Sequence, residues 1–356
     1  MGKLSGIKVI DLTQFLPGPM LGGMLADQGA EVIKVEPPAG DPARGEAPFE
    51  GGHSVWFRNL NRGKSARRLN LKEAAGRDAL WALVDDADVF LEGFRPGVMA
   101  RLGFGVDAVR ARNPRIIYCS ISAFGQHGPL AHHPAHDLTV QALSGFLAVN
   151  DGADGAPVVP GVAASDMAAG LTGLSAVLMA LFARERTGKG DAIDIAMFDS
   201  LLPWCAHTAG DAIAGGAAPQ SARQRSLGGA AFYQIYRTRD GAHIVLGGRE
   251  MKFAENLLTA LGRADLVPQA ARSAGEQGEL ITFLRGIFAE KTRAEWANWF
   301  AGRDIAFAPV LNFAEALATD HVAARNLWQA TPSGHHIAPA IRFADDAAWE
   351  ASEPPA

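Results

Sequence analysis

Hydrophobic residues in the first two hundred positions gather in short runs, with helix-like segments between them. The expected strands are residues 7–12, 31–35, 89–91, 116–121 and 192–197, and the expected helices between them include residues 20–28 and 77–85. Strand–helix–strand repeats of this length are typical of a parallel sheet with right-handed crossovers. The sequence therefore predicts an α/β fold that binds its ligand at the carboxyl ends of the strands.

The second half of the chain changes pattern and predicts a smaller α+β domain. Residues 167–183 are almost unbroken Ala, Leu, Gly, Val and Met and predict a buried helix, whereas residues 209–229 have the small and polar composition of a linker or mobile loop. After them come an expected hairpin (232–238 and 243–247) and expected helices (253–261, 280–290 and 293–300). We expect a large domain of residues 1–205 completed by residues 320–356, a linker of residues 206–229, and a small domain of residues 230–319.

Composition narrows the class of protein. The chain has 356 residues, of which 20% are charged, and a net charge of −5, so a surface dedicated to nucleic acid is not expected. Cys119 and Cys205 are too few for a disulfide framework or a metal cluster, and no metal site is expected. No apolar run approaches the roughly 18–20 residues that span a bilayer, and a strand pattern begins at once. We expect a cytoplasmic protein without a membrane partner.

His136 and Asp166 are the candidate catalytic pair. They lie 30 positions apart (166 − 136) on different predicted elements, so folding can bring them together. An imidazole and a carboxylate that face one pocket suffice to remove a proton from carbon and return one. The alternatives are structural: an Asp at the start of an apolar helix is a good N-cap, and a lone His is more often structural than catalytic. His132 and His133 are interpreted as bystanders in a polar loop.

Several longer segments resemble one known family. They are residues 4–12, 25–37, 40–44, 61–65, 87–97, 124–129 and 186–190. Together they resemble the family III CoA-transferase superfamily, which includes formyl-CoA and carnitine CoA-transferases and the α-methylacyl-CoA racemases. The resemblance implies an enzyme of CoA thioesters with a Rossmann-like large domain, a small domain and an interlocked homodimer. Coenzyme A enters as part of the acyl-CoA substrate, and no prosthetic group is implied.

The same resemblance assigns roles to three residues. In the transferases the Asp that matches Asp166 attacks the thioester, whereas in the racemases it shares proton transfer with a His that matches His136. Glu250 matches a Glu that supports this His in the racemase branch. The length of the chain also suits racemases, but Pro37 and residues 55–64 depart toward the transferases. The sequence favours a 2-methylacyl-CoA racemase, with a CoA-transferase as the alternative and an inactive CoA-thioester binding paralogue as a second alternative.

The CoA contacts are also implied by resemblance. Phosphates of CoA need Arg or Lys partners, although most basic runs are solvated turns. The candidates for phosphate contact are Arg44, Arg62, Lys64, Arg95 and Arg101, and Leu91 and Phe94 are expected on the adenine side. Backbone N–H groups of the turn that begins at Gly125 are expected to face the oxyanion of the thioester.

Overall fold

A six-stranded sheet organises the larger part of the chain. The computed structural model describes residues 2–152 and 154–343. The strands are β1 (Lys8–Asp11), β2 (Glu31–Glu36), β5 (Ser65–Arg68), β6 (Val89–Glu92), β7 (Ile117–Ser122) and β8 (Ala192–Ala196). They pair in parallel in the order β5-β2-β1-β6-β7-β8. The predicted α/β class is confirmed, and the order reverses between β1 and β6, where such sheets bind ligands.

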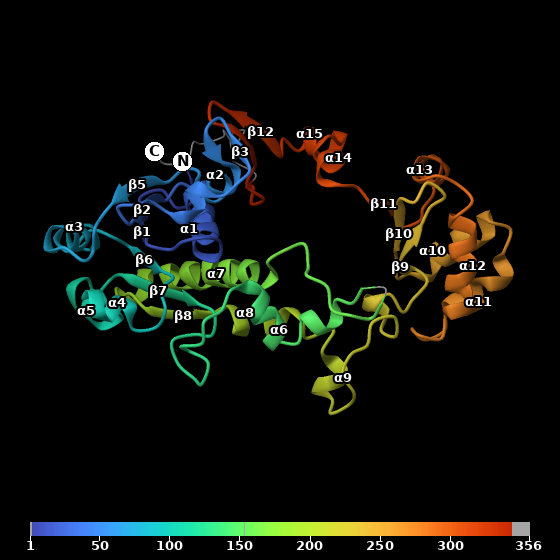
Figure 1. The fold of residues 1–356 in the computed structure, drawn as a ribbon, viewed down its shortest axis with the longest axis horizontal. Coiled ribbons are helices and arrows are strands. Elements are labelled where there is room, and N and C mark those ends of the chain that lie inside the picture. Colours follow the sequence, from blue (N-terminus) through green and yellow to red (C-terminus); the bar gives the residue numbers. More distant parts are fainter. Residues whose placement is uncertain (1, 153, 344–356) are drawn as a thin grey trace. The chain divides into compact units, whose positions relative to one another are not determined.

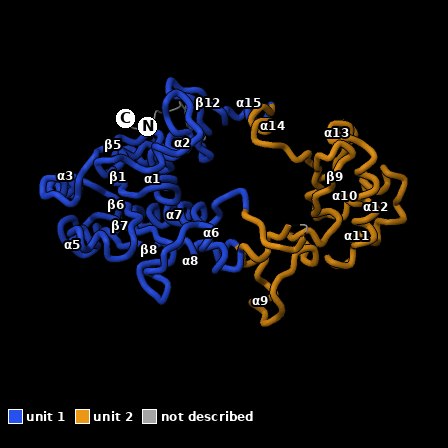
Figure 2. The backbone as a smooth tube through the Cα atoms, in the orientation of Figure 1, with its two compact units in different colours: residues 1–146, 160–204, 320–356 blue, residues 147–159, 205–319 orange. Residues whose placement is uncertain are grey.

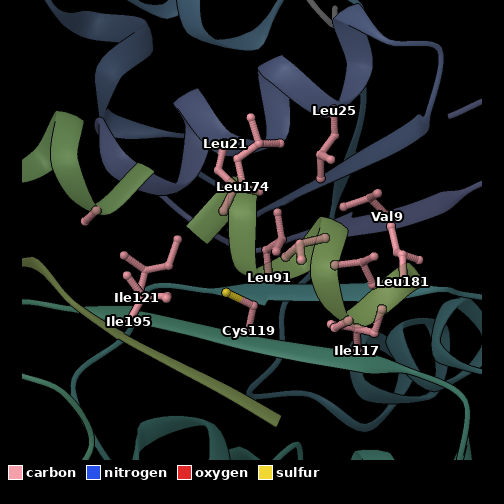
Figure 3. Close-up of a cluster of buried hydrophobic side chains, with 14 of the residues drawn as sticks. Val9, Leu21, Leu25, Leu91, Ile117, Cys119, Ile121, Leu174, Leu181 and Ile195 are labelled. Carbon is pink, nitrogen blue, oxygen red and sulfur yellow. The ribbon is translucent and has the colours of Figure 1, made fainter. Parts of the chain in front are cut away.

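Helices cover both faces of this sheet (Figure 1). On one face α1 (Pro17–Asp27) packs against α7 (Ala164–Thr187), and the other face carries α3 (Ala74–Val84), α4 (Val98–Leu102) and α5 (Val106–Arg112). Successive strand residues alternate between these layers: Val9 belongs to the core under α1 and α7, and Ile10 to the core under α3. Figure 3 shows the first core, in which Leu21 of α1 and Leu174 of α7 meet strand residues such as Leu91 and Ile121.

Two helices differ from their predicted bounds for identifiable reasons. The predicted turn at residues 17–19 is instead the first turn of α1, because a proline lacks an N–H that this turn would leave unpaired. The helix α7 is longer than predicted and ends at Gly188, whose φ of 68° is left-handed. By length and composition α7 could cross a membrane, yet 44% of its most apolar window is buried inside the protein. It is a core helix of this fold.

The chain divides into two compact units (Figure 2). Unit 1 contains residues 1–146, 160–204 and 320–356, and unit 2 contains residues 147–159 and 205–319; residues 1, 153 and 344–356 among them lie outside the described residues. Residues 147–159, predicted in the large domain, group with unit 2 instead, where Ser221 donates a hydrogen bond to the Val149 carbonyl. The predicted linker also belongs to unit 2, and includes the short helix α9 (Gly210–Ile213).

Unit 2 is built on the antiparallel sheet β11-β10-β9. The strands β9 (Tyr233–Arg237) and β10 (His243–Gly247) form the predicted hairpin, and β11 (Phe307–Pro309) was not predicted. Its core joins Tyr236 and Ile244 of the sheet to Leu257, Leu284 and Trp296 of the helices. The helices of unit 2 after α9 are α10 (Met251–Ala260), α11 (Val267–Ala270), α12 (Gly278–Phe288), α13 (Arg293–Phe300) and α14 (Phe313–Leu317).

The remaining elements of unit 1 are short. They are the helices α2 (Val55–Asn61), α6 (Asp137–Leu143), α8 (Met197–Trp204) and α15 (Asp320–Ala324), and the small hairpins β3 (Phe49–Glu50) with β4 (His53–Ser54) and β12 (Trp328–Thr331) with β13 (Gly334–Ile337). The segment after residue 320 is held by Arg58, which is fully buried and donates to the carbonyls of Ser333 and His335. The end of the described chain therefore belongs to unit 1.

Candidate active site

A cavity of about 180 Å³ lies where the strand order reverses, and we call it the Asp166 cavity. The turns after β1, β6 and β7 line it, together with His136 and Asp166. The first two turns are neighbours, since a Cβ atom placed on Gly93 would lie 3.7 Å from Thr13. The predicted pair thus shares one cavity at the carboxyl ends of the strands, the position that a parallel sheet offers a ligand.

Asp166 lies in the first turn of α7, and it is Asp137 that caps this helix. The Asp137 carboxylate accepts the backbone N–H of Ser165 at 2.9 Å and that of Asp166 at 3.3 Å, as well as the Ser165 hydroxyl at 2.6 Å. Asp137 begins α6, so the cap comes from another helix. The Asp166 carboxylate is therefore left available to the cavity, and the N-cap alternative for Asp166 does not hold.

The pKa of the Asp166 carboxyl is raised to about 7. Burial is the largest cause, and the nearby Asp137 carboxylate adds to it because two like charges repel. A half-buried acid with this pKa is present in both protonation states at neutral pH. It can act as a nucleophile when ionised or as a proton donor when protonated.

The histidines around the cavity differ from the prediction in one respect. His136 immediately precedes α6, is exposed in the single chain, and has its ring edge-on to Phe15 with 6.1 Å between ring centroids. His133, interpreted as a bystander, also lines the Asp166 cavity and packs edge-on against Phe124. The sequence signal that could have identified it was its position three residues before His136, on the same loop.

A second cavity of about 540 Å³, which we call the Asp194 cavity, lies beside the end of β6 and along β7 and β8. Arg95 and Pro96 line both cavities, so Arg95 is exposed at their junction. Phe94 lines the Asp166 cavity as well, whereas Leu91 is 0% exposed in the sheet core and has no surface to offer to adenine. Arg101 is exposed on α4. Arg95 is the candidate cation best placed for a phosphate.

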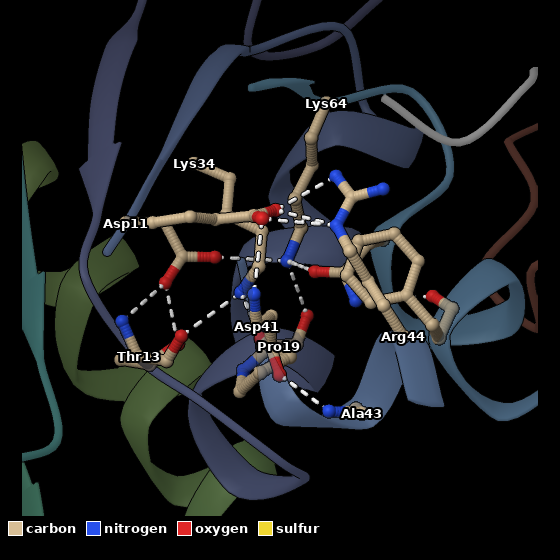
Figure 4. Close-up of polar contacts among 11 residues, drawn as sticks. Asp11, Thr13, Pro19, Lys34, Asp41, Ala43, Arg44 and Lys64 are labelled. Atoms are coloured by element: carbon tan, nitrogen blue, oxygen red, sulfur yellow. Dashed lines mark hydrogen bonds and ion pairs between the residues drawn. The ribbon is translucent and has the colours of Figure 1, made fainter. Parts of the chain in front are cut away.

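The other three basic candidates take part in internal ion pairs. Lys64 is buried and donates to Asp11, to the Pro19 carbonyl and to Asn61, which uses all three of its N–H groups. Arg62 pairs with Asp27, and Arg44 pairs with Glu36 while stacking on Phe57 (Figure 4 shows Arg44 and Lys64). A phosphate contact by Lys64 would break an existing bond. These three CoA contacts remain predictions from resemblance, and the structure gives each residue a structural partner.

Two further predicted roles remain untested. Glu250 is in unit 2, exposed at the start of α10, where its carboxylate accepts the Arg249 N–H. Its predicted contact with His136 of unit 1 stays a prediction. In the turn expected to bind the oxyanion, Gly125 has a φ of 79° and the next N–H, that of Gln126, already donates to Asp194 at 2.9 Å. That donor is therefore committed within the protein.

The described parts of the chain contain no cluster of side chains suited to binding a metal ion. Among residues 2–152 and 154–343, no three His, Cys, Asp or Glu side chains are grouped so as to hold an ion.

The sequence of this chain is similar to those of several known proteins. The chain is 38% identical over 334 residues to an acetyl-CoA:oxalate CoA-transferase of Acetobacter aceti (92% of this chain, 85% of the relative). It is 32% identical over 367 residues to a human succinyl-CoA:glutarate CoA-transferase (99% and 83%) and 36% identical over 325 residues to human alpha-methylacyl-CoA racemase (89% and 80%).

A solved structure shares the fold of this chain along nearly its whole length. A CAIB/BAIF family protein from Brucella suis superimposes with a TM-score of 0.88 at 30% identity, covering 99% of this chain and 96% of that one. The profile of CoA-transferase family III matches residues 4–355. The predicted superfamily is thereby confirmed, and the chain belongs to CoA-transferase family III.

Proposed function

We propose that this protein transfers CoA from an acyl-CoA to a carboxylic acid, with Asp166 as the nucleophile. The observation that carries the proposal is the Asp166 carboxylate, half-buried in a cavity at the switch point of the sheet and not used as a helix cap. The comparisons favour this alternative over the racemase that the sequence favoured, because the similar proteins include CoA-transferases that act with oxalate, glutarate and mesaconate. The order of the two hypotheses is therefore reversed.

The proposed reaction is an exchange of acyl bonds at Asp166. An ionised Asp166 oxygen attacks the thioester carbon, the C–S bond breaks, and a mixed anhydride and CoA thiolate result. The thiolate then attacks the Asp166 carbonyl of the anhydride, which releases the donor acid and leaves CoA as a thioester on Asp166. The acceptor carboxylate attacks this thioester, and the expelled thiolate attacks the acceptor acyl carbon. Acceptor-CoA leaves, Asp166 returns ionised, and no net proton is consumed.

The surroundings of Asp166 suit this cycle. Desolvation, the main cause of its raised pKa, also makes an ionised carboxylate a stronger nucleophile because fewer hydrogen bonds hold its charge. Arg95 lies at the junction of the two cavities, so it can hold a CoA phosphate in one while the thioester enters the other. The acyl group and the acceptor acid remain to be identified by assay.

Racemisation of a 2-methylacyl-CoA is the second candidate. It is favoured by His136, which lines the same cavity as Asp166, and by the 36% identity to human alpha-methylacyl-CoA racemase. In that reaction one of the two residues removes the α-proton, an enolate forms, and the other residue returns a proton to the opposite face. In that reaction Glu250 would support His136, as the resemblance implies.

One pair of incubations separates the two candidates. The enzyme would first receive acetyl-CoA or succinyl-CoA with oxalate or glutarate as acceptor, followed by hydroxylamine and peptide mass spectrometry. A transferase forms the new thioester, and its trapped intermediate leaves a hydroxamate on Asp166. The second incubation would use a chiral 2-methylacyl-CoA in deuterated water without an acceptor.

The second incubation decides against the proposal if deuterium enters the α-carbon and Asp166 stays unmodified in the first. In that case His136→Ala should abolish exchange, whereas a transferase should tolerate this change better. Absence of both reactions in a folded protein that binds CoA would instead support the inactive paralogue.

We further propose that the protein works as a homodimer, interlocked as the family resemblance implies, in the cytoplasm. The outward face of α7 exposes Leu171, Leu178, Met179 and Phe182, the last two at 70% and 67%, and an apolar helix face of this size favours a partner. Exposure of His136 in the single chain also suits a site that a second copy completes. Light scattering should give about twice 37.5 kDa, and a mass near 37.5 kDa at micromolar concentration would contradict the dimer.

A further inference from the structure

Four charged side chains lie buried beside the Asp166 cavity, and we call Asp11, Lys34, Asp41 and Lys64 the ion cluster (Figure 4). Each side chain is at most 1% exposed, and the charges balance as two carboxylates and two ammonium groups. The pairs are Lys64 with Asp11 at 2.8 Å and Lys34 with Asp41 at 2.7 Å. The proposed reaction uses none of the four, so their burial calls for another explanation.

The ion cluster holds by its backbone both ends of residues 13–19, a loop that runs into the first turn of α1. Lys34 donates to the Thr13 carbonyl at 2.9 Å, and Asp11 accepts the Thr13 N–H at 2.9 Å. At the other end Lys64 donates to the Pro19 carbonyl at 2.8 Å. Residues 13–19 therefore run between two charge-assisted anchors, which are stronger than neutral hydrogen bonds.

The loop between these anchors forms one wall of the Asp166 cavity. Thr13, Gln14, Phe15, Pro17 and Gly18 all line it. Phe15 has a φ of 63°, a left-handed conformation that strains a bulky residue and persists only where the surroundings enforce it. Its ring contacts the ring of His136 edge-on. Phe15 thus has its strained conformation between the Thr13 and Pro19 carbonyls, which the two lysines hold in place.

The helix α1 adds a close approach over the ion cluster. A Cβ atom on Gly22 would lie 2.7 Å from Asp11 Oδ2 and 3.1 Å from Lys64 Nζ, so only glycine fits there. The cluster is thus sealed by the first helix of the fold. Buried ion pairs add little to stability by themselves, because desolvation offsets their attraction. A packed apolar group would fill the same volume without anchoring the two carbonyls.

We propose that the ion cluster is a positioning device of the active site: Lys34 and Lys64 fix the Thr13 and Pro19 carbonyls, and thereby hold Phe15 against His136. Lys34 and Lys64 are then positioning residues that act through the loop. For Lys64 this is a role other than the phosphate contact that the resemblance implies, and for Lys34 and Asp41 it supplies a role that the sequence did not suggest. In this proposal Lys34 and Lys64 influence the position of the His136 ring without contacting it, because the loop lies between them.

The test compares Lys34→Met with a matched control. Lys34 is buried and lines neither cavity, so its loss acts through the loop and the pair with Asp41 and not through a ligand contact. The control is Arg184→Met, which breaks the ion pair of the buried Arg184 with the half-buried Asp88 at 2.8 Å; these partners are far from residues 13–19 in the sequence and line neither cavity. Lys34→Met/Asp41→Asn is the second variant, because it leaves no unpaired charge if the single variant folds poorly.

Two readouts do not depend on the proposed reaction. Hydrogen exchange of the amides in residues 13–19, followed by mass spectrometry, should accelerate by about tenfold or more in the Lys34 variants and stay unchanged in Arg184→Met. The ring C–H signal of His136, assigned through His136→Gln, should move toward its position in Phe15→Leu. A role in stability alone would move neither signal selectively.

A third readout rests on the proposed function. The kcat of CoA transfer should fall about tenfold or more in the Lys34 variants while KM for acyl-CoA changes less, because the loop places groups around the reacting carbon. If the folded Lys34 variants match Arg184→Met in both exchange and the His136 signal, the positioning role is refuted. If those two signals change but no CoA transfer is found even in the wild type, the proposed function fails and the positioning role stands.

Discussion

Asp166 and Asp11 are both shielded aspartates of unit 1, yet their neighbours give them opposite properties. Asp166 has a carboxylate nearby, and burial together with the charge of Asp137 raises its pKa to about 7. Burial would also raise the pKa of Asp11, but the charges of Lys64 and Lys34 and the hydrogen bonds from Lys64 and Thr13 outweigh it and lower that pKa. The neighbours, and not the residue type, decide which carboxylate can react.

The difference also separates chemistry from architecture. The Asp11 carboxylate accepts hydrogen bonds from Lys64 and from Thr13, so both of its oxygens have donors and it is unreactive. Asp166 lies in a cavity where burial and the Asp137 carboxylate both disfavour its ionised form, an arrangement that makes a carboxylate reactive at the expense of stability. One region is a fixed support, and the other is a site under electrostatic strain.

The largest expected effect is loss of activity without Asp166. Asp166→Ala should reduce CoA transfer by about ten-thousandfold or more, because no other group can carry the acyl and CoA intermediates. Thermal unfolding should show that the variant is folded. Activity within tenfold of the wild type, measured as formation of acceptor-CoA, would remove Asp166 from the role of nucleophile.

Removing the other carboxylate should affect stability first. Asp11→Asn leaves Lys64 and Lys34 buried with one acid between them, and an uncompensated buried charge costs about 3–5 kcal/mol. Urea unfolding measures this loss. Asp86→Asn, which breaks the exposed pair with Lys8, is the control and should change the midpoint little. Equal midpoints for both variants would contradict the account of the ion cluster.

The third expected effect has the opposite sign. The pKa of Asp166 is about 7 in the fold against an ordinary value of 3.8, so folding favours the protonated acid. Stability is therefore lost as pH rises from about 3.8 to about 7, and Asp166→Asn, which mimics the neutral acid, avoids this loss. The variant should be more stable than the wild type by about 1–3 kcal/mol at pH 8.5 and nearly equal at pH 4. Denaturant midpoints at the two pH values measure it, and equal gains at both would argue against a raised pKa.

Local sequence signals predicted much of the fold. The helix α13 matches residues 293–300 because Thr292 and Glu295 form a capping box that fixes where it begins. The hairpin of β9 and β10 follows from its alternating pattern around a Gly-containing turn. The strand β5, with the sequence Ser-Ala-Arg-Arg, was missed because an edge strand needs no apolar pattern.

The candidate site was predictable only where a single residue carries the signal. His136 and Asp166 stand out by type and position, and they share a cavity. The partners that define the chemistry of the aspartates do not stand out in the sequence. Asp137 caps a helix 28 positions away, and Lys64 is 53 positions away from Asp11. Basic residues near a turn suggested phosphate binding by Lys64, whereas folding surrounds it with acceptors. Contacts of this kind depend on the register of the sheet, which no local pattern determines.

The smallest expected effect tests the link between Asp137 and Asp166. Asp137→Asn keeps an oxygen for the N–H groups of Ser165 and Asp166, and Gln141, whose Oε1 has no hydrogen-bond partner among the described residues, can turn to accept the new amide. The cap survives, but the charge that helps to raise the Asp166 pKa is gone. The acidic limb of the pH–rate profile for CoA transfer should therefore move down by about half to one pH unit. Asp107→Asn, on exposed α5, is the charge-matched control and should leave the limb in place. An unchanged limb in Asp137→Asn would mean that burial alone sets the pKa of Asp166, and the contrast with Asp11 would then rest on the lysines rather than on the carboxylate neighbour.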